Sequence, residues 1–256
     1  MTKLSVAVIT LNEEKNMGRC LKSVEEIADE IIVVDSGSKD KTLEIAKEFG
    51  AKTFYNQWPG HVAQKNIALE KCSGDWILSL DADECLTPEL AQKIKNIIDS
   101  EQTSKADGYY LNRRSYYLGK WMRYAWYPEW RIRLIKGGTG KWVGTDPHDN
   151  LNVIGNTAKL KGADMLHYSY RDLKHHMEVT IKYAHIGAQA DLKKGKRFSP
   201  FKMVFSPLAR FLKLFFIKRA WMDGWRGWIA MGSSMMAAFL KQAFLFEGIV
   251  TNKSKK

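Results

Sequence analysis

The first hundred residues alternate between two hydrophobic periodicities, and no other feature of the chain constrains its fold as strongly. Short apolar runs rich in β-branched residues lie at Leu4–Thr10, Glu30–Asp35 and Asp75–Leu80. Helical spacing of apolar residues marks four further segments, Glu13–Val24, Lys41–Phe49, Val62–Lys71 and Pro88–Ile98. Strands that alternate with helices build a parallel sheet covered on both faces. The alternation therefore predicts an α/β fold with a mostly parallel, Rossmann-like sheet.

The rest of the chain changes character twice. Residues 107–166 are irregular, aromatic and punctuated by glycine, and their short strand-like runs favour a mixed or antiparallel extension of the same sheet. Apolar residues then recur at helical spacing over Asp172–Lys193, and the aromatic-rich segments Met203–Ile217 and Ala220–Gly248 are also mostly helical. We expect a sheet domain over residues 1–171, with halves 1–105 and 106–171, followed by a helical region over residues 172–256.

Charge is spread unevenly along the chain. The net charge is +12, yet residues 1–100 carry 12 Lys and Arg against 17 Asp and Glu, whereas the remainder carries 28 against 11. An anionic partner is therefore expected to bind the second half. Cys20, Cys72 and Cys85 have neither metal-ligand nor CxxC spacing, and no secretory signal precedes the first strand. These features favour a reducing cytoplasm.

Polar motifs follow three of the predicted strands. TLNE ends at Glu13, DSGS begins at Asp35, and DADE spans Asp81 to Glu84. In an open parallel sheet, ligands bind at the carboxyl ends of the strands, so the three motifs are expected to face one crevice. The chain has neither GxGxxG nor GxxxxGK[ST], the glycine-rich phosphate loops. A nucleotide here would be held by carboxylates and a metal ion instead.

The DADE motif crowds three carboxylates into four residues, which repel one another unless positive charge lies between them. Mg²⁺ or Mn²⁺ takes one or two protein carboxylates together with substrate phosphate oxygens, and Asp81 and Asp83 at a strand end suit that arrangement. The alternative is a solvated acidic loop before a helix that Thr87 caps. An EF-hand is excluded, because its glycine and glutamate positions hold Leu86 and Gln92.

Several motifs occur together in one order: VAVITLNEE at residues 6–14, EIIVVDSGS at 30–38, QKN at 64–66 and WILSLDADE at 76–84. In this order and spacing they resemble the family 2 glycosyltransferases, which have the GT-A fold. YPEWRIRL at 127–134, HD at 148–149 and HYSY at 167–170 extend the resemblance toward the lipopolysaccharide inner-core β-glucosyltransferases. The resemblance implies an enzyme that inverts the sugar's anomeric configuration in one displacement.

The resemblance also implies roles for residues of the first half. Thr10, Asn12, Glu13 and Asp35 match the positions that hold the nucleoside, Lys65 matches a position near the diphosphate, Asp81 contacts the ribose or the metal, and Asp83 binds the metal. For Asp35 the chemistry is direct, because uracil N3 donates a hydrogen bond and a carboxylate accepts one. The alternatives are that Asp35 only caps the next turn and that Lys65 is solvated on its helix.

The acceptor hydroxyl must lose its proton as it attacks, which requires a base within hydrogen-bond reach. Asp149 is the first candidate, although the resembling branch usually has Glu at this position, and Glu129 is the second. His167 matches a position that supplies a late metal or diphosphate contact, and its alternative is a structural role among aromatic residues. Either carboxylate is alternatively an ordinary loop residue.

The C-terminal region combines positive charge with aromatic rings. Ten Lys and Arg and one acidic residue, Asp223, lie between Lys193 and Arg226, interleaved with Phe and Trp. No RNA- or DNA-binding motif accompanies them, so no nucleic-acid partner is expected. Basic and aromatic residues on helices favour peripheral binding to an anionic membrane, on the inner face of the cytoplasmic membrane. A helical cap on the sheet domain is the alternative.

Together these features predict a metal-dependent inverting glycosyltransferase, with Mg²⁺ or Mn²⁺ as its cofactor. It would move a hexose from a nucleotide sugar, preferably a UDP-sugar, to a hydroxyl of a lipopolysaccharide-core type acceptor, a glycolipid or oligosaccharide. One alternative is a polyprenyl-phosphate sugar synthase, which transfers to a lipid phosphate. The other is a non-catalytic protein that binds nucleotide sugars on the same fold.

Overall fold

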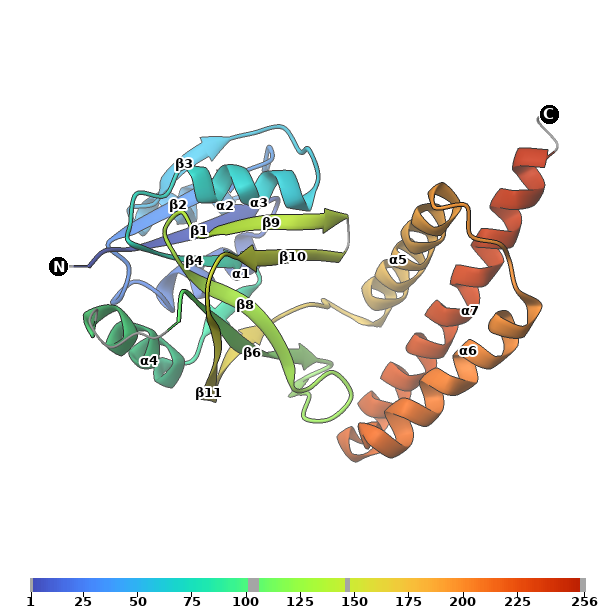
Figure 1. Ribbon diagram of the computed structural model, residues 1–256. Helices are drawn as coiled ribbons and strands as arrows, with labels where there is room; N and C mark the ends of the chain where they lie inside the picture. The colour runs from blue at the N-terminus through green and yellow to red at the C-terminus, as the bar shows by residue number, and fades with distance from the viewer. Residues whose placement is uncertain (1, 101–105, 146–147, 254–256) are drawn as a thin grey trace. The chain divides into compact units, whose positions relative to one another are not determined.

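The structure is a computed structural model that describes residues 2–100, 106–145 and 148–253 (Figure 1). The chain divides into two compact units. The first unit, the sheet unit, contains residues 1–114 and 128–168, and the second, the helical unit, contains residues 115–127 and 169–256. The helical unit therefore includes a short segment from the middle of the chain in addition to the C-terminal region, which was predicted as residues 172–256.

The sheet unit has a parallel half and an antiparallel half. In the parallel half, strands lie in the order β3, β2, β1, β4, with bounds Lys52–Tyr55, Glu30–Asp35, Leu4–Thr10 and Trp76–Asp81. The sheet continues through β8, β6, β11 and β5, with bounds Glu129–Lys136, Gly108–Tyr117, Thr157–His167 and Glu84–Leu86. β8 runs antiparallel to β4, which confirms the predicted mixed extension.

Both faces of the sheet are covered, as the continuous apolar strands predict. Leu4, Val6 and Val8 of β1 pack in one cluster with α1 (Glu14–Lys22), α2 (Thr42–Glu48) and α4 (Pro88–Asp99). Ala7 and Ile9 face the opposite side, where they pack with α3 and with Trp142 and Leu151. The bounds of the covering elements on that side are α3 His61–Glu70, β9 Gly140–Thr145 and β10 His148–Val153. β9 and β10 pair as an antiparallel hairpin that the sequence pattern did not predict.

The helices of the sheet unit begin and end within about two residues of the predicted bounds. Thr87 caps α4 as predicted, because its Oγ1 accepts a hydrogen bond from the backbone N of Leu90 at 3.3 Å. Gly50 ends α2 with a positive φ of 69°, a conformation that glycine adopts without steric cost. These local signals fix the start of α4 and the end of α2.

The helical unit is built from α5 (Leu173–Lys193), α6 (Pro200–Leu212) and α7 (Trp225–Lys253). A π-helical turn, Lys213–Ile217, continues α6, and a 3₁₀ turn, Ala220–Asp223, precedes α7. Tyr117, Met122 and Ala125 are buried with Ala220, Ala230 and Met231, so the mid-chain segment supplies half of this core. Asp223 accepts hydrogen bonds from the backbone N–H groups of residues 123, 124 and 125 at 2.9 to 3.0 Å.

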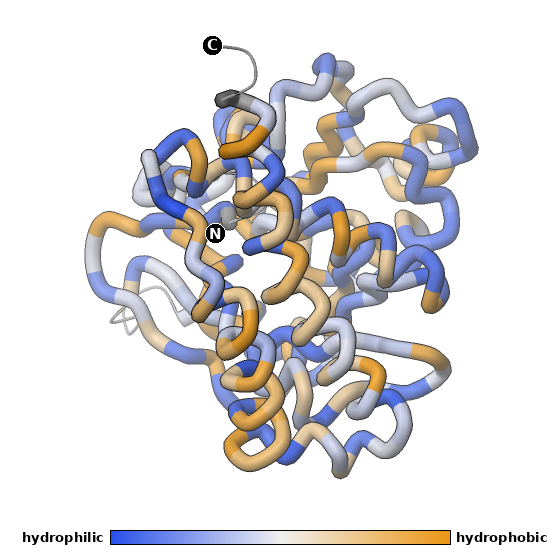
Figure 2. Tube along the Cα trace, turned by 90° about the vertical axis from the view of Figure 1, so that its right-hand side faces the viewer, coloured by the Kyte–Doolittle hydropathy of each residue, from blue (hydrophilic) through white to orange (hydrophobic). Residues whose placement is uncertain are grey.

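One helix of the described chain, over Trp225–Thr251, is long and apolar enough to cross a membrane by length and composition, with a mean hydropathy of 1.3. Its longest run without a charged residue, residues 227–240, is shorter than the ~18 apolar residues expected of a spanning helix. Figure 2 shows hydrophobic residues, in orange, at intervals along the helix that ends near the C-terminus. α7 also packs on α5 and α6, so this finding alone is weak evidence for a membrane span.

Candidate functional site

Positive side chains lie beside the carboxylate of Asp81. Lys65 Nζ on α3 lies 2.9 Å from Asp81 Oδ1, and Arg133 Nη2 on β8 lies 3.0 Å from Asp81 Oδ2. Burial raises the pKa of Asp81, but the charges of Lys65 and Arg133 outweigh it, so the pKa lies well below its usual range. Asp81 is therefore ionised and paired, and its loop is not a simple solvated acidic turn.

Glu84 lies beneath this pair and is fully buried. Its Oε1 accepts hydrogen bonds from Arg133 Nη2 at 2.8 Å and Arg113 Nη1 at 3.1 Å, and its Oε2 accepts from Arg133 Nε at 3.0 Å. Glu84 Oε2 also accepts from the backbone N of Asp81 at 3.1 Å. Glu84 thus holds the backbone of the DADE loop and the arginine that contacts Asp81, so its role is to position the loop.

Asp83 and His167 lie together at the other end of the same loop. Strand β5 pairs with the end of β11, with His167 opposite Glu84, and this register places His167 Nε2 3.2 Å from Asp83 Oδ2. Burial raises the pKa of Asp83, yet His167 outweighs it and the pKa is lowered. Two of the three predicted metal ligands, Asp83 and His167, are brought together from distant parts of the sequence.

Asp149 lies close to Asp81 because the β9–β10 hairpin is fastened to α3. The Asn66 side chain donates to the carbonyl O of Trp142 and accepts from the backbone N of Trp142, both at 2.9 Å. Asp149 on β10 then reaches Lys65, whose Nζ lies 2.8 Å from Asp149 Oδ2. Burial raises the pKa of Asp149, but the positive charge of Lys65 lowers it by more, so the pKa is below its usual range.

Lys65 is only 5% exposed and joins the two carboxylates. Its Nζ also lies 4.3 Å from the centre of the Trp142 ring, a cation–π contact. Lys65 is therefore not the solvated lysine of the alternative interpretation. The sequence pattern missed Arg133, Arg113 and Trp142, which complete this arrangement. Arg133 lies in an alternating strand and within the YPEWRIRL motif at 127–134, but neither pattern indicated that its side chain is only 3% exposed.

Glu129, the second candidate base, is bound by two arginines. Arg113 Nε and Nη2 each lie 2.9 Å from a Glu129 oxygen, and Arg131 Nη2 lies 2.7 Å from Oε1. Burial raises the pKa of Glu129, but the two guanidinium groups lower it to about 2. Both candidate bases are thus held by cations in the protein, Glu129 by two guanidinium groups and Asp149 by one ammonium group.

The predicted nucleoside residues lie on the loops after β1 and β2. Asn12 has a positive φ of 54°, and its Oδ1 accepts from the backbone N of Lys39 at 2.9 Å. The backbone N of Glu13 donates to Thr42 Oγ1 at 2.8 Å. Thr10 Oγ1 is buried and has no hydrogen-bond partner within the described part of the chain. The two loops are thus tied together, and Thr10 leaves one buried polar atom at their base.

Asp35 is 1% exposed and closes its own turn. Its Oδ2 accepts from the backbone N–H groups of Gly37 at 2.8 Å and Ser38 at 2.9 Å, and its Oδ1 accepts from the Ser38 hydroxyl. These contacts match the capping alternative. A carboxylate has about four acceptor positions, so they leave room for one more donor.

The donor set fits a hard divalent cation that a substrate helps to bind. Asp83 and His167 offer one oxygen and one nitrogen at the sheet edge, and Mg²⁺ or Mn²⁺ commonly takes few protein ligands and fills the remaining positions with water and phosphate. Within residues 2–100, 106–145 and 148–253, no three His, Cys, Asp or Glu side chains are grouped to hold a metal without such help.

Two known glycosyltransferases match nearly the whole of this chain. The uncharacterized glycosyltransferase RT0209 of Rickettsia typhi is 34% identical over 257 residues, covering 96% of this chain and 88% of that protein. The lipopolysaccharide core biosynthesis glycosyltransferase LpsC of Rhizobium meliloti is 30% identical over 255 residues, covering 95% of this chain and 92% of LpsC.

A solved structure of glucosyl-3-phosphoglycerate synthase from Mycobacterium tuberculosis, with Mn²⁺, uridine diphosphate and glucosyl-3-phosphoglycerate, is 25% identical over 46% of this chain and 45% of that chain, with a TM-score of 0.35. The model of the family described as glycosyl transferase family 2 matches residues 5–150. The mixed α/β sheet with its helical C-terminal extension is the predicted GT-A fold. The chain belongs to glycosyl transferase family 2.

Proposed function

We propose that this chain is a metal-dependent inverting glycosyltransferase that moves a hexose from a UDP-sugar to a hydroxyl of a lipopolysaccharide-core type acceptor. One observation carries the proposal: Lys65 holds Asp149 and Asp81 beside each other, within 2.8 and 2.9 Å of its own Nζ. A candidate base and the donor loop thus lie on either side of one cation. The similarity to LpsC over most of both chains supports the acceptor class.

On the donor side, the loops after β1 and β2 would hold the nucleoside through Thr10, Asn12, Glu13 and Asp35. Asp83 and His167 would hold Mg²⁺ or Mn²⁺, with Asp81 nearest the ribose. The metal ion, when bound, would neutralise charge that develops on the diphosphate leaving group. Without a donor, Lys65 and Arg133 are paired with Asp81. When the donor binds, Lys65 would contact its diphosphate instead.

On the acceptor side, Asp149 would act as the general base. The acceptor oxygen forms a bond to the anomeric carbon of the donor sugar while the bond from that carbon to the phosphate oxygen breaks. The acceptor's proton passes to the Asp149 carboxylate, and the nucleoside diphosphate leaves with the bonding electron pair. Attack opposite to the leaving group inverts the anomeric configuration. Glu129 is the second candidate and is held by Arg113 and Arg131.

The helical unit would bind the inner face of the cytoplasmic membrane peripherally, where a glycolipid acceptor is accessible. Its support is the cationic and aromatic composition of residues 193–226 and the exposure of several rings, with Trp225 82% and Phe201 68% exposed. An active site on the cytoplasmic side of this membrane would have access to nucleotide sugars.

The deciding experiment measures donor turnover with a panel of UDP-, ADP- and GDP-sugars and three acceptors: a purified lipopolysaccharide core, a polyprenyl phosphate and water alone. We expect transfer to the core with a UDP-hexose and inversion at the anomeric carbon by NMR of the product. Transfer to the polyprenyl phosphate would instead support the sugar synthase. Donor binding without turnover on any acceptor would support the binding protein.

A further inference from the structure

Helix α6 presents three different faces along its length. One face is apolar and exposed, with side chains spaced as on one side of a helix: Phe201, Val204, Phe205, Leu208 and Leu212. A second face packs inward, where Phe211 and, just beyond the helix, Leu214 and Phe215 contact the core of the helical unit. The third face is polar and cationic. At 3.6 residues per turn, the apolar and cationic faces lie about 150° apart around the helix.

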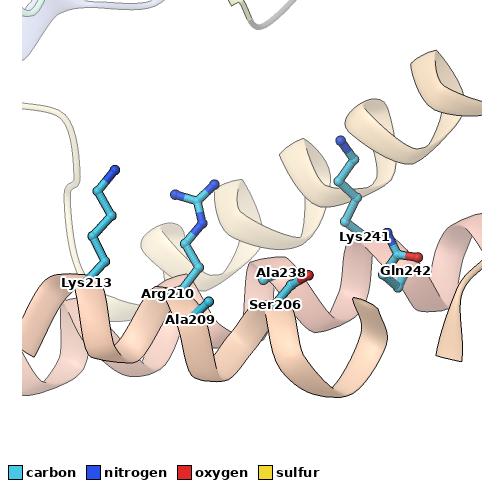
Figure 3. Close-up of a pocket in the computed structure, with 7 residues that line it drawn as sticks. All are labelled: Ser206, Ala209, Arg210, Lys213, Ala238, Lys241 and Gln242. Carbon is cyan, nitrogen blue, oxygen red and sulfur yellow. The ribbon is translucent and has the colours of Figure 1, made fainter. Parts of the chain in front are cut away.

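The cationic face of α6 forms one wall of a groove against α7, with a volume of about 480 Å³. Ser206 and Arg210 contribute from α6, Lys213 from the π-helical turn that continues it, and Lys241 and Gln242 from α7. Figure 3 shows the side chains of Arg210, Lys213 and Lys241 extending to the same side of the two helices. Three cations and two neutral polar groups therefore line one open groove.

The positive charge of the groove is only partly balanced. Lys241 Nζ lies 2.8 Å from Asp191 Oδ2. The other oxygen of the same carboxylate, Oδ1, pairs with Lys196 at 2.7 Å, so one negative charge serves two lysines. Arg210 and Lys213 have no ion-pair partner within the described residues. Gln242 Oε1 is buried there without a hydrogen-bond partner in the described chain. The groove thus offers two unpaired cations and one unused acceptor.

We propose that this groove binds the phosphate group of an anionic membrane phospholipid while the apolar face of α6 lies among the acyl chains. The inference rests on the membrane association proposed above and names the site that carries it. Arg210 and Lys213 would contact the phosphate oxygens, and a hydroxyl of a glycerol headgroup would donate to Gln242 Oε1. An amphipathic helix with this arrangement lies in the plane of the interface.

Charge complementarity favours a membrane over other occupants of the apolar face. No Asp or Glu occurs between residues 192 and 222, so every charged side chain on α6, beside its exposed rings, is positive. A second copy of the chain would bring two such cationic faces together, and like charges repel. An anionic lipid surface attracts all of them and accepts the apolar side chains as well.

The test uses the full-length protein and vesicle sedimentation. The vesicles contain three parts phosphatidylcholine to one part phosphatidylglycerol, or phosphatidylcholine alone, and neither contains glycolipid. The groove variant is Arg210→Gln with Lys213→Gln. The matched control is Lys182→Gln with Lys194→Gln, which removes the same charge from exposed positions of the same unit outside the groove. A third variant, Phe205→Ser, tests the apolar face.

We expect wild-type protein to bind the phosphatidylglycerol vesicles, the groove variant to lose about 30-fold in affinity, and the control to lose about threefold or less. Phe205→Ser should weaken binding at high salt, where the electrostatic part is screened. Glycerol phosphate at millimolar concentration should not release the protein, because a free phosphate lacks the acyl chains.

Equal losses for the groove variant and the control would overturn the groove site and leave membrane association standing. If the wild-type protein does not bind the vesicles at low salt, both the groove site and membrane association are wrong. The proposal of sugar transfer to the lipopolysaccharide core would not be affected. Release by glycerol phosphate would assign the groove to a soluble phosphate compound. A dimer in solution that Phe205→Ser dissociates would show that a second copy covers the apolar face.

Discussion

Lys65 Nζ lies 2.8 Å from Asp149 Oδ2, although 84 positions separate the two residues in the chain. The contact exists because Asn66, the next residue on α3, pairs with the backbone of Trp142 and so fastens the β9–β10 hairpin to the helix. One short helical segment therefore sets the position of the candidate base relative to Asp81. The effects of substituting Lys65 and Asp149 on activity should consequently not be additive.

Asp149→Asn should lower the transfer rate about 10²- to 10⁴-fold, the range that a general base contributes, because an amide cannot accept the acceptor's proton. Donor binding, measured by calorimetry with a UDP-sugar, should change little. Glu129→Gln is the comparison. If Glu129→Gln loses the activity and Asp149→Asn keeps it, the role of base passes to Glu129.

Lys65→Met should change the pH dependence of kcat/KM as well as its size. In the wild type, Lys65 holds the pKa of Asp149 below its usual range despite burial, so the ionised base is present and kcat/KM should be flat from neutral to mildly acidic pH. Without Lys65, burial remains and raises the pKa of Asp149. The decrease in kcat/KM at acidic pH should then begin at a higher pH than in the wild type. An unchanged pH profile would mean that the ionisation of Asp149 does not limit the rate.

Asp83→Asn should weaken binding of Mn²⁺ in the presence of UDP and reduce metal-dependent turnover, because one of two protein ligands loses its charge. His167→Gln should act in the same direction, and Asp99→Asn on the exposed end of α4 serves as the control. Mn²⁺ binding by electron paramagnetic resonance, with and without UDP, measures the effect apart from activity. Wild-type affinity in both variants would remove Asp83 and His167 from the metal site.

Much of the sheet unit was predictable because its signals are local. The buried strands β1, β2 and β4 are continuous apolar runs, and Thr87 with Pro88 marks the start of α4. The short strands β3 and β5 and the β9–β10 hairpin were not predicted. β5 contains three residues, and its pairing with β11 joins positions about 80 apart, so no local periodicity reports it.

The sequence predicted Lys65 and His167 together with the carboxylates of the site, whereas it did not predict Arg113 and Arg133. The sequence posed the question of what balances Asp81, Asp83 and Glu84, and a metal ion was the proposed answer. In the structure, Lys65, Arg133 and His167 already lie against these carboxylates. Arg133 reaches them only because β8 pairs with β4, a long-range pairing that residue spacing does not encode.

Glu84→Gln should destabilise the sheet unit by about 3 kcal/mol, because the buried Arg133 guanidinium loses one of its two charged partners and keeps only Asp81. Glu84 is 0% exposed and Arg133 is 3% exposed, so water cannot replace the lost contact. Urea denaturation provides the free energy of unfolding. Glu70→Gln, at an exposed position of α3, should change it by less than about 0.5 kcal/mol. Similar values for the two variants would mean that the buried network contributes little.

His176→Gln should change how the stability of the helical unit depends on pH. His176 is 2% exposed, and its Nδ1 shares a hydrogen bond of 2.7 Å with the Tyr117 hydroxyl. Burial, with a smaller effect of His175, lowers the pKa of His176 to about 4, whereas an unfolded histidine has a pKa of about 6.5.

Between pH 6.5 and 4 the unfolded state therefore binds a proton at His176 that the folded state does not bind. The stabilisation is fully present above pH 6.5 and falls as the pH decreases toward 4, by at most about 3 kcal/mol. Glutamine does not titrate, so the difference in free energy of unfolding between wild type and His176→Gln should narrow over this window. Urea denaturation followed by near-ultraviolet circular dichroism at pH 7 and pH 4.5 measures it, and a constant difference would mean that His176 is protonated in the folded protein as readily as in the unfolded chain.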